Sequence, residues 1–195
     1  MSKTTLDLST IVGITSGTHT VKVKAKAVGY RDSEFSNEVS YTENGVQNIC
    51  LTGDTLITLA DGTTKRIDTI TLADMVLAYN PETMTLEADE IIYCDSDKIK
   101  THDNFDVWTF DDGTIIKTVH RHRFYNVERN AMVYMDKWKI GEHGRRKDGV
   151  LVTLVSHENV KETVNHYTIF TKNQNYFANG LLSGNRYTKR LFIEG

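Results

Sequence analysis

Short segments of the chain alternate apolar and polar residues, while the 3.6-residue repeat of an amphipathic helix is rare. Residues 55–59 and 20–27 both show the two-residue period of a β-strand with one buried face. Threonine and valine recur throughout, and a single proline is present. The pattern predicts an all-β protein, with further strands at residues 35–41, 90–93, 107–110, 114–119, 151–155 and 167–170.

Turn signals separate these segments. Asp61-Gly62 and Asp111-Asp112-Gly113 each lie between two predicted strands and are typical of β-hairpin turns. The Asn44-Gly45 pair marks a boundary inside the polar residues 42–47. Residues 141–149 are polar and glycine-rich, which predicts a loop.

The residues before this boundary form a unit of their own. Residues 16–42 contain two alternating segments around a turn at residues 29–33, and they resemble the last strands of a fibronectin type III module. Such a module needs about seven strands, and only about three are expected here. We therefore interpret residues 1–46 as a partial fibronectin type III-like segment; a hairpin that adds to the next domain is the alternative.

Net charge, the length of apolar runs and the cysteine content exclude several classes of function. The formal net charge is −3 and the isoelectric point about 6.2, which argues against a nucleic-acid binder that relies on a basic surface. No apolar run approaches the roughly 18 residues of a membrane span, and no signal peptide is expected. Two cysteines, Cys50 and Cys94, do not suggest a disulfide framework, so a reducing compartment is expected.

Cys50 opens the most informative stretch of the chain, CLTGDTLITLADGTTKRIDTITLADMVLAYN. We expect Cys50 to sit just before a strand, where its thiol can attack the carbonyl carbon of Ile49. This stretch resembles the opening of an intein-type, or Hint, self-processing domain, and NYFANGLLSGN at residues 175–185 resembles the end of the same family. The resemblance implies a Hint horseshoe of β-strands over residues 47–185, with Cys50 and Asn185 close in space and residues 186–195 as a C-terminal flank.

The resemblance also implies an autocatalytic reaction. An N-to-S acyl shift at Cys50 would give a thioester with Ile49, and an imidazole would protonate the departing amide nitrogen. We favour His122 for this role, with Thr118 or His120 assisting. His120 lies two residues from His122, and so on the same face of the expected strand; either imidazole can act.

The closing motif departs from the family pattern. Asn185 can cyclise and release the chain from Arg186 onward, but the family's preceding histidine is replaced by Gly184. The family's upstream histidine falls on Gln174, and its acidic or amide position falls on Tyr167. Because these imidazoles are missing, cleavage after Asn185 is expected to be weak. Because Arg186 offers no nucleophile to receive the acyl group, no efficient splicing is expected.

We therefore expect single-turnover autoproteolysis by a monomer that acts on its own flanking chain. No cofactor, nucleic acid or membrane is expected to take part. His120 and His122 could chelate zinc from one strand face, but no metal is expected, because the histidines and cysteines lack the spacing of a structural zinc site. A bacterial cytoplasm or a phage-encoded protein fits the reducing compartment. The alternative is a catalytically inactive Hint scaffold that serves as a structural or binding module of a larger phage-like or surface protein.

Overall fold

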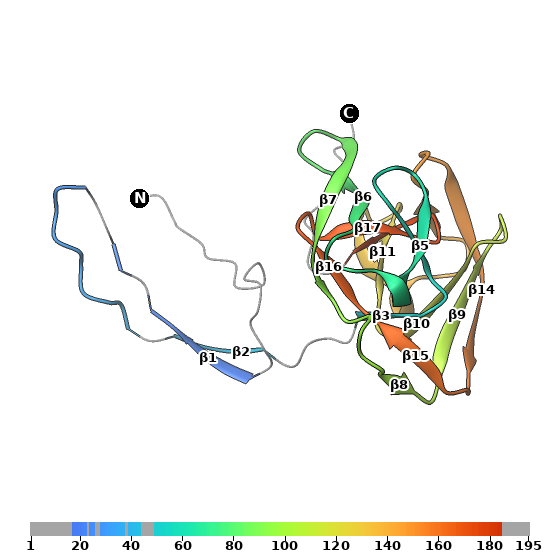
Figure 1. The fold of residues 1–195 in the computed structure, drawn as a ribbon, viewed down its shortest axis with the longest axis horizontal. Coiled ribbons are helices and arrows are strands. Elements are labelled where there is room, and N and C mark those ends of the chain that lie inside the picture. The colour runs from blue at the N-terminus through green and yellow to red at the C-terminus, as the bar shows by residue number, and fades with distance from the viewer. Residues whose placement is uncertain (1–16, 23, 26–27, 38, 44–48, 185–195) are drawn as a thin grey trace. The chain divides into compact units, whose positions relative to one another are not determined.

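The computed structural model describes residues 17–22, 24–25, 28–37, 39–43 and 49–184. The chain divides into two compact units, Met1–Gln47 and Asn48–Gly195 (Figure 1). In both units the regular elements are β-strands joined by turns and short 3₁₀ turns, so the prediction of an all-β protein is confirmed.

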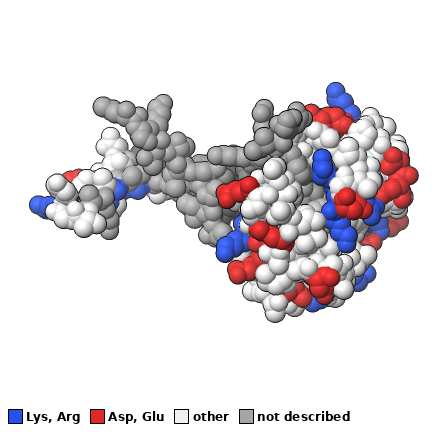
Figure 2. Space-filling view, turned by 90° about the horizontal axis from the view of Figure 1, so that it is seen from above, with Lys and Arg blue, Asp and Glu red and all other residues white. Residues whose placement is uncertain are grey.

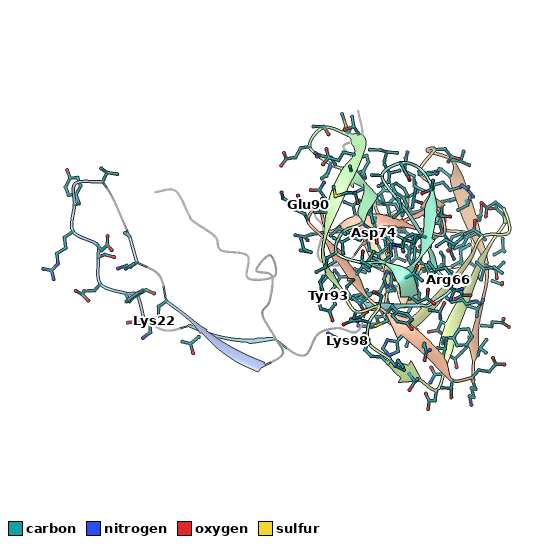
Figure 3. All side chains as sticks on the ribbon, viewed as in Figure 1. Lys22, Arg66, Asp74, Glu90, Tyr93 and Lys98 are labelled. Atoms are coloured by element: carbon teal, nitrogen blue, oxygen red, sulfur yellow. The ribbon has the colours of Figure 1, made fainter. Side chains whose placement is uncertain are left out.

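In the described part of the smaller unit, β1 (Gly17–Val21) pairs antiparallel with β2 (Val39–Glu43) to form a hairpin. The strands predicted at residues 20–27 and 35–41 are therefore displaced. Residues 28–37 form no strand and are exposed, as is Lys22 (Figure 3). A partial fibronectin type III module is not shown by this hairpin and stays a prediction.

The larger unit contains the remaining strands (Figure 1), which run in chain order as follows: β3 (Ile49–Thr52), β4 (Leu56–Thr58), β5 (Thr64–Arg66), β6 (Met75–Asn80), β7 (Thr85–Cys94), β8 (Thr101–His102), β9 (Phe105–Phe110), β10 (Ile115–His120), β11 (Arg123–Asn126), β12 (Ala131–Tyr134), β13 (His143–Arg145), β14 (Leu151–Val160), β15 (Val164–Tyr167), β16 (Ile169–Thr171), β17 (Asn175–Ala178) and β18 (Leu181–Gly184). Two 3₁₀ turns, η2 (Ile67–Thr69) and η3 (Met135–Lys137), lie between them.

These strands form a long curved sheet and a smaller one. Among the described residues, the long sheet follows the order β5-β4-β17-β18-β11-β13-β14-β9-β10-β3-β15-β8, with β12 beside β11. The smaller sheet has the order β16-β7-β6. β3 lies inside the long sheet, paired antiparallel with β10 on one side and β15 on the other.

Two of the predicted hairpin turns are present. Gly62 closes the β4–β5 turn and Gly113 the β9–β10 turn, with backbone φ angles of +86° and +84°. These angles lie in the left-handed region, which glycine enters without the steric cost that a Cβ would bring. The aspartates before each glycine bind the following backbone: Asp61 accepts from Thr63 N, and Asp112 from Thr114 N.

The sheets enclose one large apolar core. Its members come from strands throughout the unit, and each fully buried side chain of this size contributes roughly 1.5–3 kcal/mol to folding. Among them are Leu51, Ile57, Ile67, Ile70, Val76, Trp108, Phe110, Ile116, Phe124, Met135, Leu154, Ile169 and Tyr176. Cys50, Val119 and Phe177 are also buried, so the strand that carries Cys50 is part of the folded core.

Four expectations about local structure need correction. Cys50 lies within strand β3, not before a strand, because the turn falls at Gly53-Asp54. The strand expected to carry both His120 and His122 ends at His120, and the strand expected at residues 167–170 is interrupted at Thr168. The loop expected at residues 141–149 contains β13, which pairs with β14.

Asn175 joins the two sheets. Its side chain is fully buried, accepts a hydrogen bond from Tyr79 N at 2.7 Å and donates one to Tyr79 O at 2.8 Å. The amide thus satisfies both backbone groups of a residue in β6 from a position in β17. Buried backbone groups without such partners are strongly unfavourable.

We predict that Asn175→Ala lowers the free energy of unfolding by about 2–4 kcal/mol, because two buried backbone groups lose their partner. Urea denaturation followed by circular dichroism measures the change. Asn104→Ala is the matched control, since Asn104 is partly exposed and bonds its neighbour Asp103. Equal losses in the two variants would contradict this role for Asn175.

Candidate functional site

The thiol of Cys50 and the carbonyl of Ile49 share one partner, the hydroxyl of Thr168. Cys50 Sγ lies 3.2 Å from Thr168 Oγ1, and Thr168 Oγ1 donates to Ile49 O at 3.2 Å. A hydroxyl has a single proton, so when it donates to Ile49 it can only accept from the thiol. Thr168 therefore holds a thiol next to the carbonyl of the preceding peptide bond and polarises that carbonyl.

Thr168 is itself fixed by a buried carboxylate. It lies between β15 and β16, and its backbone N–H donates to Asp95 Oδ1 at 2.7 Å. Asp95 is only 1% exposed and forms an ion pair with Lys100. The interruption of the strand thus leaves Thr168 N free to bond a side chain instead of a neighbouring strand.

The thiol is held in its protonated form. Burial raises the pKa of Cys50, and the negative charge of Asp95 raises it further, while the Thr168 hydroxyl and Lys100 act in the opposite direction. The raised pKa means that the resting site contains a thiol, and that attack on Ile49 requires a group that accepts its proton.

His122 is the buried imidazole of the site. Its Nε2 lies 2.8 Å from Ser183 Oγ and 3.5 Å from the hydroxyl of Tyr176. Burial lowers the pKa of His122 to about 3, with a further contribution from Arg123, and the backbone of Ile49 opposes this shift. Ile49 therefore lies beside the ring, although Nδ1 has no partner of normal hydrogen-bond geometry in the described part of the chain.

The contacts of His122 bring the two ends of the larger unit together. Ser183 lies on β18, which pairs with β11 through Arg123↔Gly184 and Phe124↔Ser183. One imidazole thus contacts Ser183 near the end of the unit and lies beside Ile49 at its start. Asn185 and Arg186, the predicted residues of the C-terminal bond, lie outside the described residues.

Two other predicted site residues, Thr118 and His120, lie on β10 beside β3. Thr118 is buried, but its Oγ1 accepts a hydrogen bond from Trp108 Nε1 at 3.0 Å, and its strand position faces Leu51 rather than Cys50. The backbone of His120 pairs with Ile49, while its side chain lies outside the described residues. The structure thus brings Cys50, Ile49 and His122 together, whereas the hydroxyl of Thr118 is bonded to Trp108.

Sequence reasoning did not single out Thr168. It placed the family's acidic or amide position on the neighbouring Tyr167, whose side chain lies close to Gly53, while Thr168 contacts the thiol. The only signal was a threonine inside a predicted strand, which is ordinary. Asp95 was missed as well, because its contact with Thr168 spans 73 residues of sequence.

The surface charges and the possible metal ligands give no further information about the chemistry of this site. Figure 2 shows acidic and basic side chains interspersed on one face of the molecule. The described residues bring together no group of three histidine, cysteine or acidic side chains able to hold a metal ion. None of the helices that they form has the length and apolar character that a membrane span requires.

Comparison with solved structures decides the fold. A DnaB intein from Synechocystis sp. PCC 6803 is 20% identical, with a TM-score of 0.59, over 72% of this chain and 99% of the intein. A bacterial intein-like domain from Clostridium thermocellum is 21% identical, with a TM-score of 0.61, over 69% of this chain and 97% of that domain. The larger unit has the Hint fold.

A DnaX mini intein from Spirulina platensis is similar too, at 24% identity and a TM-score of 0.56, over 69% of this chain and 98% of the intein. No family model and no curated protein matches the chain. The Hint fold expected from the two terminal motifs is thus confirmed by structure. Because the identities are low, the likeness extends to the fold and not to the reaction.

The lowered pKa of His122 predicts a pH-dependent stability. Between about pH 6.5 and pH 3 the unfolded chain binds a proton that the folded chain excludes, so the free energy of unfolding falls as the pH is lowered. From pH 7 to pH 5 this contribution amounts to about 2 kcal/mol. Urea denaturation at both pH values should show a correspondingly smaller difference in His122→Gln, and an unchanged difference would contradict a buried neutral imidazole.

Proposed function

We propose that the larger unit catalyses cleavage of its own N-terminal flank through an N-to-S acyl shift at Cys50. The observation that carries this proposal is the contact of one hydroxyl, that of Thr168, with both Cys50 Sγ and Ile49 O at 3.2 Å. Holding a nucleophile beside its target in this way replaces a bimolecular encounter by an intramolecular one. The Hint fold of the unit supports the same reaction.

The shift exchanges one bond for another. The sulfur of Cys50 attacks the carbonyl carbon of Ile49, the Thr168 hydroxyl stabilises the developing oxyanion, and the C–N bond to Cys50 breaks. The amide nitrogen leaves as a free amine and the new bond is a thioester. An external thiol or water then takes the acyl group and releases the flank that ends at Ile49.

His122 moves the proton in this scheme. At neutral pH the lowered pKa keeps the ring uncharged. In the proposed scheme the ring takes the thiol proton only while the sulfur attacks and returns it at once to the departing nitrogen, because an imidazole with a pKa of about 3 cannot hold a proton against a thiol whose pKa is raised. The same group thus acts first as base and then as acid, and the charged imidazolium exists only between the two transfers. The unpartnered Nδ1 is the nitrogen available for this task.

The burial of Cys50 also favours the second candidate, an inactive Hint scaffold within a larger protein. A thiol that is 1% exposed and has a raised pKa is a weak nucleophile unless its proton is removed. In that case the residues of the site contribute only to packing and catalyse no reaction. Chemical detection of the thioester separates the two candidates.

We expect the purified protein, incubated at neutral pH with dithiothreitol, to release a fragment that ends at Ile49. Cys50→Ala should abolish the release because no thioester can form, whereas Cys94→Ala, the matched cysteine control on β7, should cleave as the parent does. Mass spectrometry identifies the fragments. Release at the parent rate from Cys50→Ala would exclude the acyl shift, and no release from the parent would favour the inactive scaffold.

At the C-terminal bond we propose slow cleavage after Asn185 and no splicing. Gly184 supplies no imidazole, and a Cβ at this position would lie 2.9 Å from Met132 Sδ and 3.0 Å from its Cγ. Met132, on β12, therefore fills the space that a side chain at residue 184 would need. The missing imidazole is the obstacle to Asn185 cyclisation, and Met132 is the side chain that must move before an imidazole can be introduced at residue 184.

We predict that Gly184→His/Met132→Ala releases residues 186–195 faster than the parent, by up to about 10²-fold, because an imidazole gains both a place and a role. Gly184→His alone should gain less, and Met132→Ala alone should gain nothing. Asn185→Ala in the double variant should stop the release. A spliced product of residues 1–49 and 186–195 in the unmodified protein would contradict this account.

A further inference from the structure

We propose that Asp95 and Lys100 act together as a positioning pair for Cys50: Asp95 fixes Thr168 at the reacting bond, and Lys100 shields the thiol from the charge of Asp95. This inference rests on the proposed acyl shift and assigns a role to two residues that do not touch the reacting atoms. Both residues lie on the connection between β7 and β8, and Asp95 contacts the backbone of Thr168.

The positioning role follows from the contacts of Asp95. Its Oδ1 accepts the Thr168 N–H at 2.7 Å, and Oδ2 pairs with the Lys100 ammonium. Because Thr168 stands at an interruption between two strands, this carboxylate replaces the ladder bond that would otherwise set the backbone of Thr168. The direction of the Thr168 hydroxyl, and hence its contact with Ile49 O, depends on that bond.

The connection that carries Asp95 is bonded both within itself and to the strands beside Thr168. Lys98 N donates to Asp95 O at 2.9 Å, which closes a turn, and Ser96 Oγ donates to Ile70 O. The Lys98 ammonium lies 5.6 Å from the ring centroid of Tyr93, near the end of β7 (Figure 3). Cys94 pairs with Ile169, and His166 N donates to Lys100 O, so the turn holds Asp95 at a fixed place beside the interruption at Thr168.

The charge of Asp95 requires a separate explanation. An asparagine could accept the same hydrogen bond from Thr168 without the cost of burying a carboxylate. The buried charge acts on the thiol: Asp95 raises the pKa of Cys50 and Lys100 lowers it. Lys100 thus offsets the electrostatic cost that Asp95 imposes on thiolate formation.

The other ionisable groups that face Cys50 are uncharged at neutral pH. His122, between β10 and β11, has its pKa lowered to about 3 by burial. Tyr176, on β17, has its pKa raised well above the usual range by burial, and the charge of Asp95 raises it further, while a hydrogen bond with Ser183 acts in the opposite direction. Burial and the Thr168 hydroxyl have the larger effects on the pKa of Cys50, and among the described residues Asp95 and Lys100 are the charges that then act on it, in opposite directions.

A series of charge variants in a Cys94→Ser background tests the shielding. The pKa of Cys50 is read from the pH titration of its ¹³Cβ resonance, without any need for cleavage. Lys100→Met should raise this pKa by about one unit, and Asp95→Asn should lower it by about one unit. Asp95→Asn/Lys100→Met should lie near the parent, and Lys98→Met, which removes a neighbouring ammonium on the same turn, should leave it unchanged.

Cleavage in dithiothreitol tests the positioning. Asp95→Asn keeps an acceptor for Thr168 N and should cleave at least as fast as the parent, whereas Asp95→Ala should slow cleavage by about tenfold, as should Thr168→Val. Far-UV circular dichroism confirms that each variant is folded. If Asp95→Ala does not fold, the comparison of Asp95→Asn with Thr168→Val still reports on the acceptor.

Shifts of the Cys50 pKa in the same direction in Lys100→Met and Asp95→Asn, or no shift in either, would overturn the shielding. Cleavage of Asp95→Asn as slow as that of Thr168→Val would overturn the positioning. A parent protein that releases no fragment would refute the acyl shift instead, and the titration series would still decide whether the pair sets the acidity of Cys50.

Discussion

The pairing of β3 on both of its edges is the constraint on which the site depends. β10 bonds one edge and β15 the other, and all four residues Ile49–Thr52 are buried. The Ile49–Cys50 peptide bond is therefore held inside the sheet, away from bulk water. This burial fixes the orientation of the peptide bond toward neighbouring groups. The same burial raises the pKa of the Cys50 thiol, because it disfavours the thiolate.

The groups that act on this bond come from interruptions in the neighbouring strands. β10 ends at His120 and β11 begins at Arg123, which leaves His122 between them; Thr168 separates β15 from β16 in the same way. The freed backbone groups find other partners, since His122 O accepts from Met135 N and Thr168 N donates to Asp95. The interruptions thus direct polar side chains into the core without leaving these backbone groups unsatisfied.

Local signals in the sequence predicted the parts of the fold that depend on local interactions. Asp61-Gly62 and Asp111-Asp112-Gly113 specified two hairpins because their glycines adopt positive φ angles. The position of Cys50 inside a strand was not predictable, since β3 is set by its pairing with β10 and β15 rather than by its own pattern. In the smaller unit the Lys-Val alternation predicted a strand that the hairpin register of β1 and β2 places elsewhere.

The residues of the candidate site also divide into those with a local sequence signal and those defined by contacts between distant residues. Cys50 and His122 were found because each belongs to a short motif, whereas Thr168 and Asp95 act through a contact between residues 73 positions apart. The contact of Thr168 with the thiol could not be predicted from the sequence, because Thr168 and Tyr167 both belong to a segment predicted as a strand. Only the interruption of the strand distinguishes the residue that contacts the thiol from its neighbour.

The two ends of the Hint unit are unequally equipped, and this inequality argues for a one-sided reaction. At Cys50 a hydroxyl contacts the thiol and the Ile49 carbonyl, an imidazole lies beside Ile49, and a buried ion pair bonds the backbone of Thr168. At the other end Gly184 brings no functional group, and Met132 lies beside it. His122 Nε2 is bonded to Ser183, and in the proposed scheme the ring serves the N-terminal bond. We therefore expect the proposed thioester to form faster than Asn185 cyclises, with the acyl group of the N-terminal flank passing to an external nucleophile rather than to the C-terminal flank.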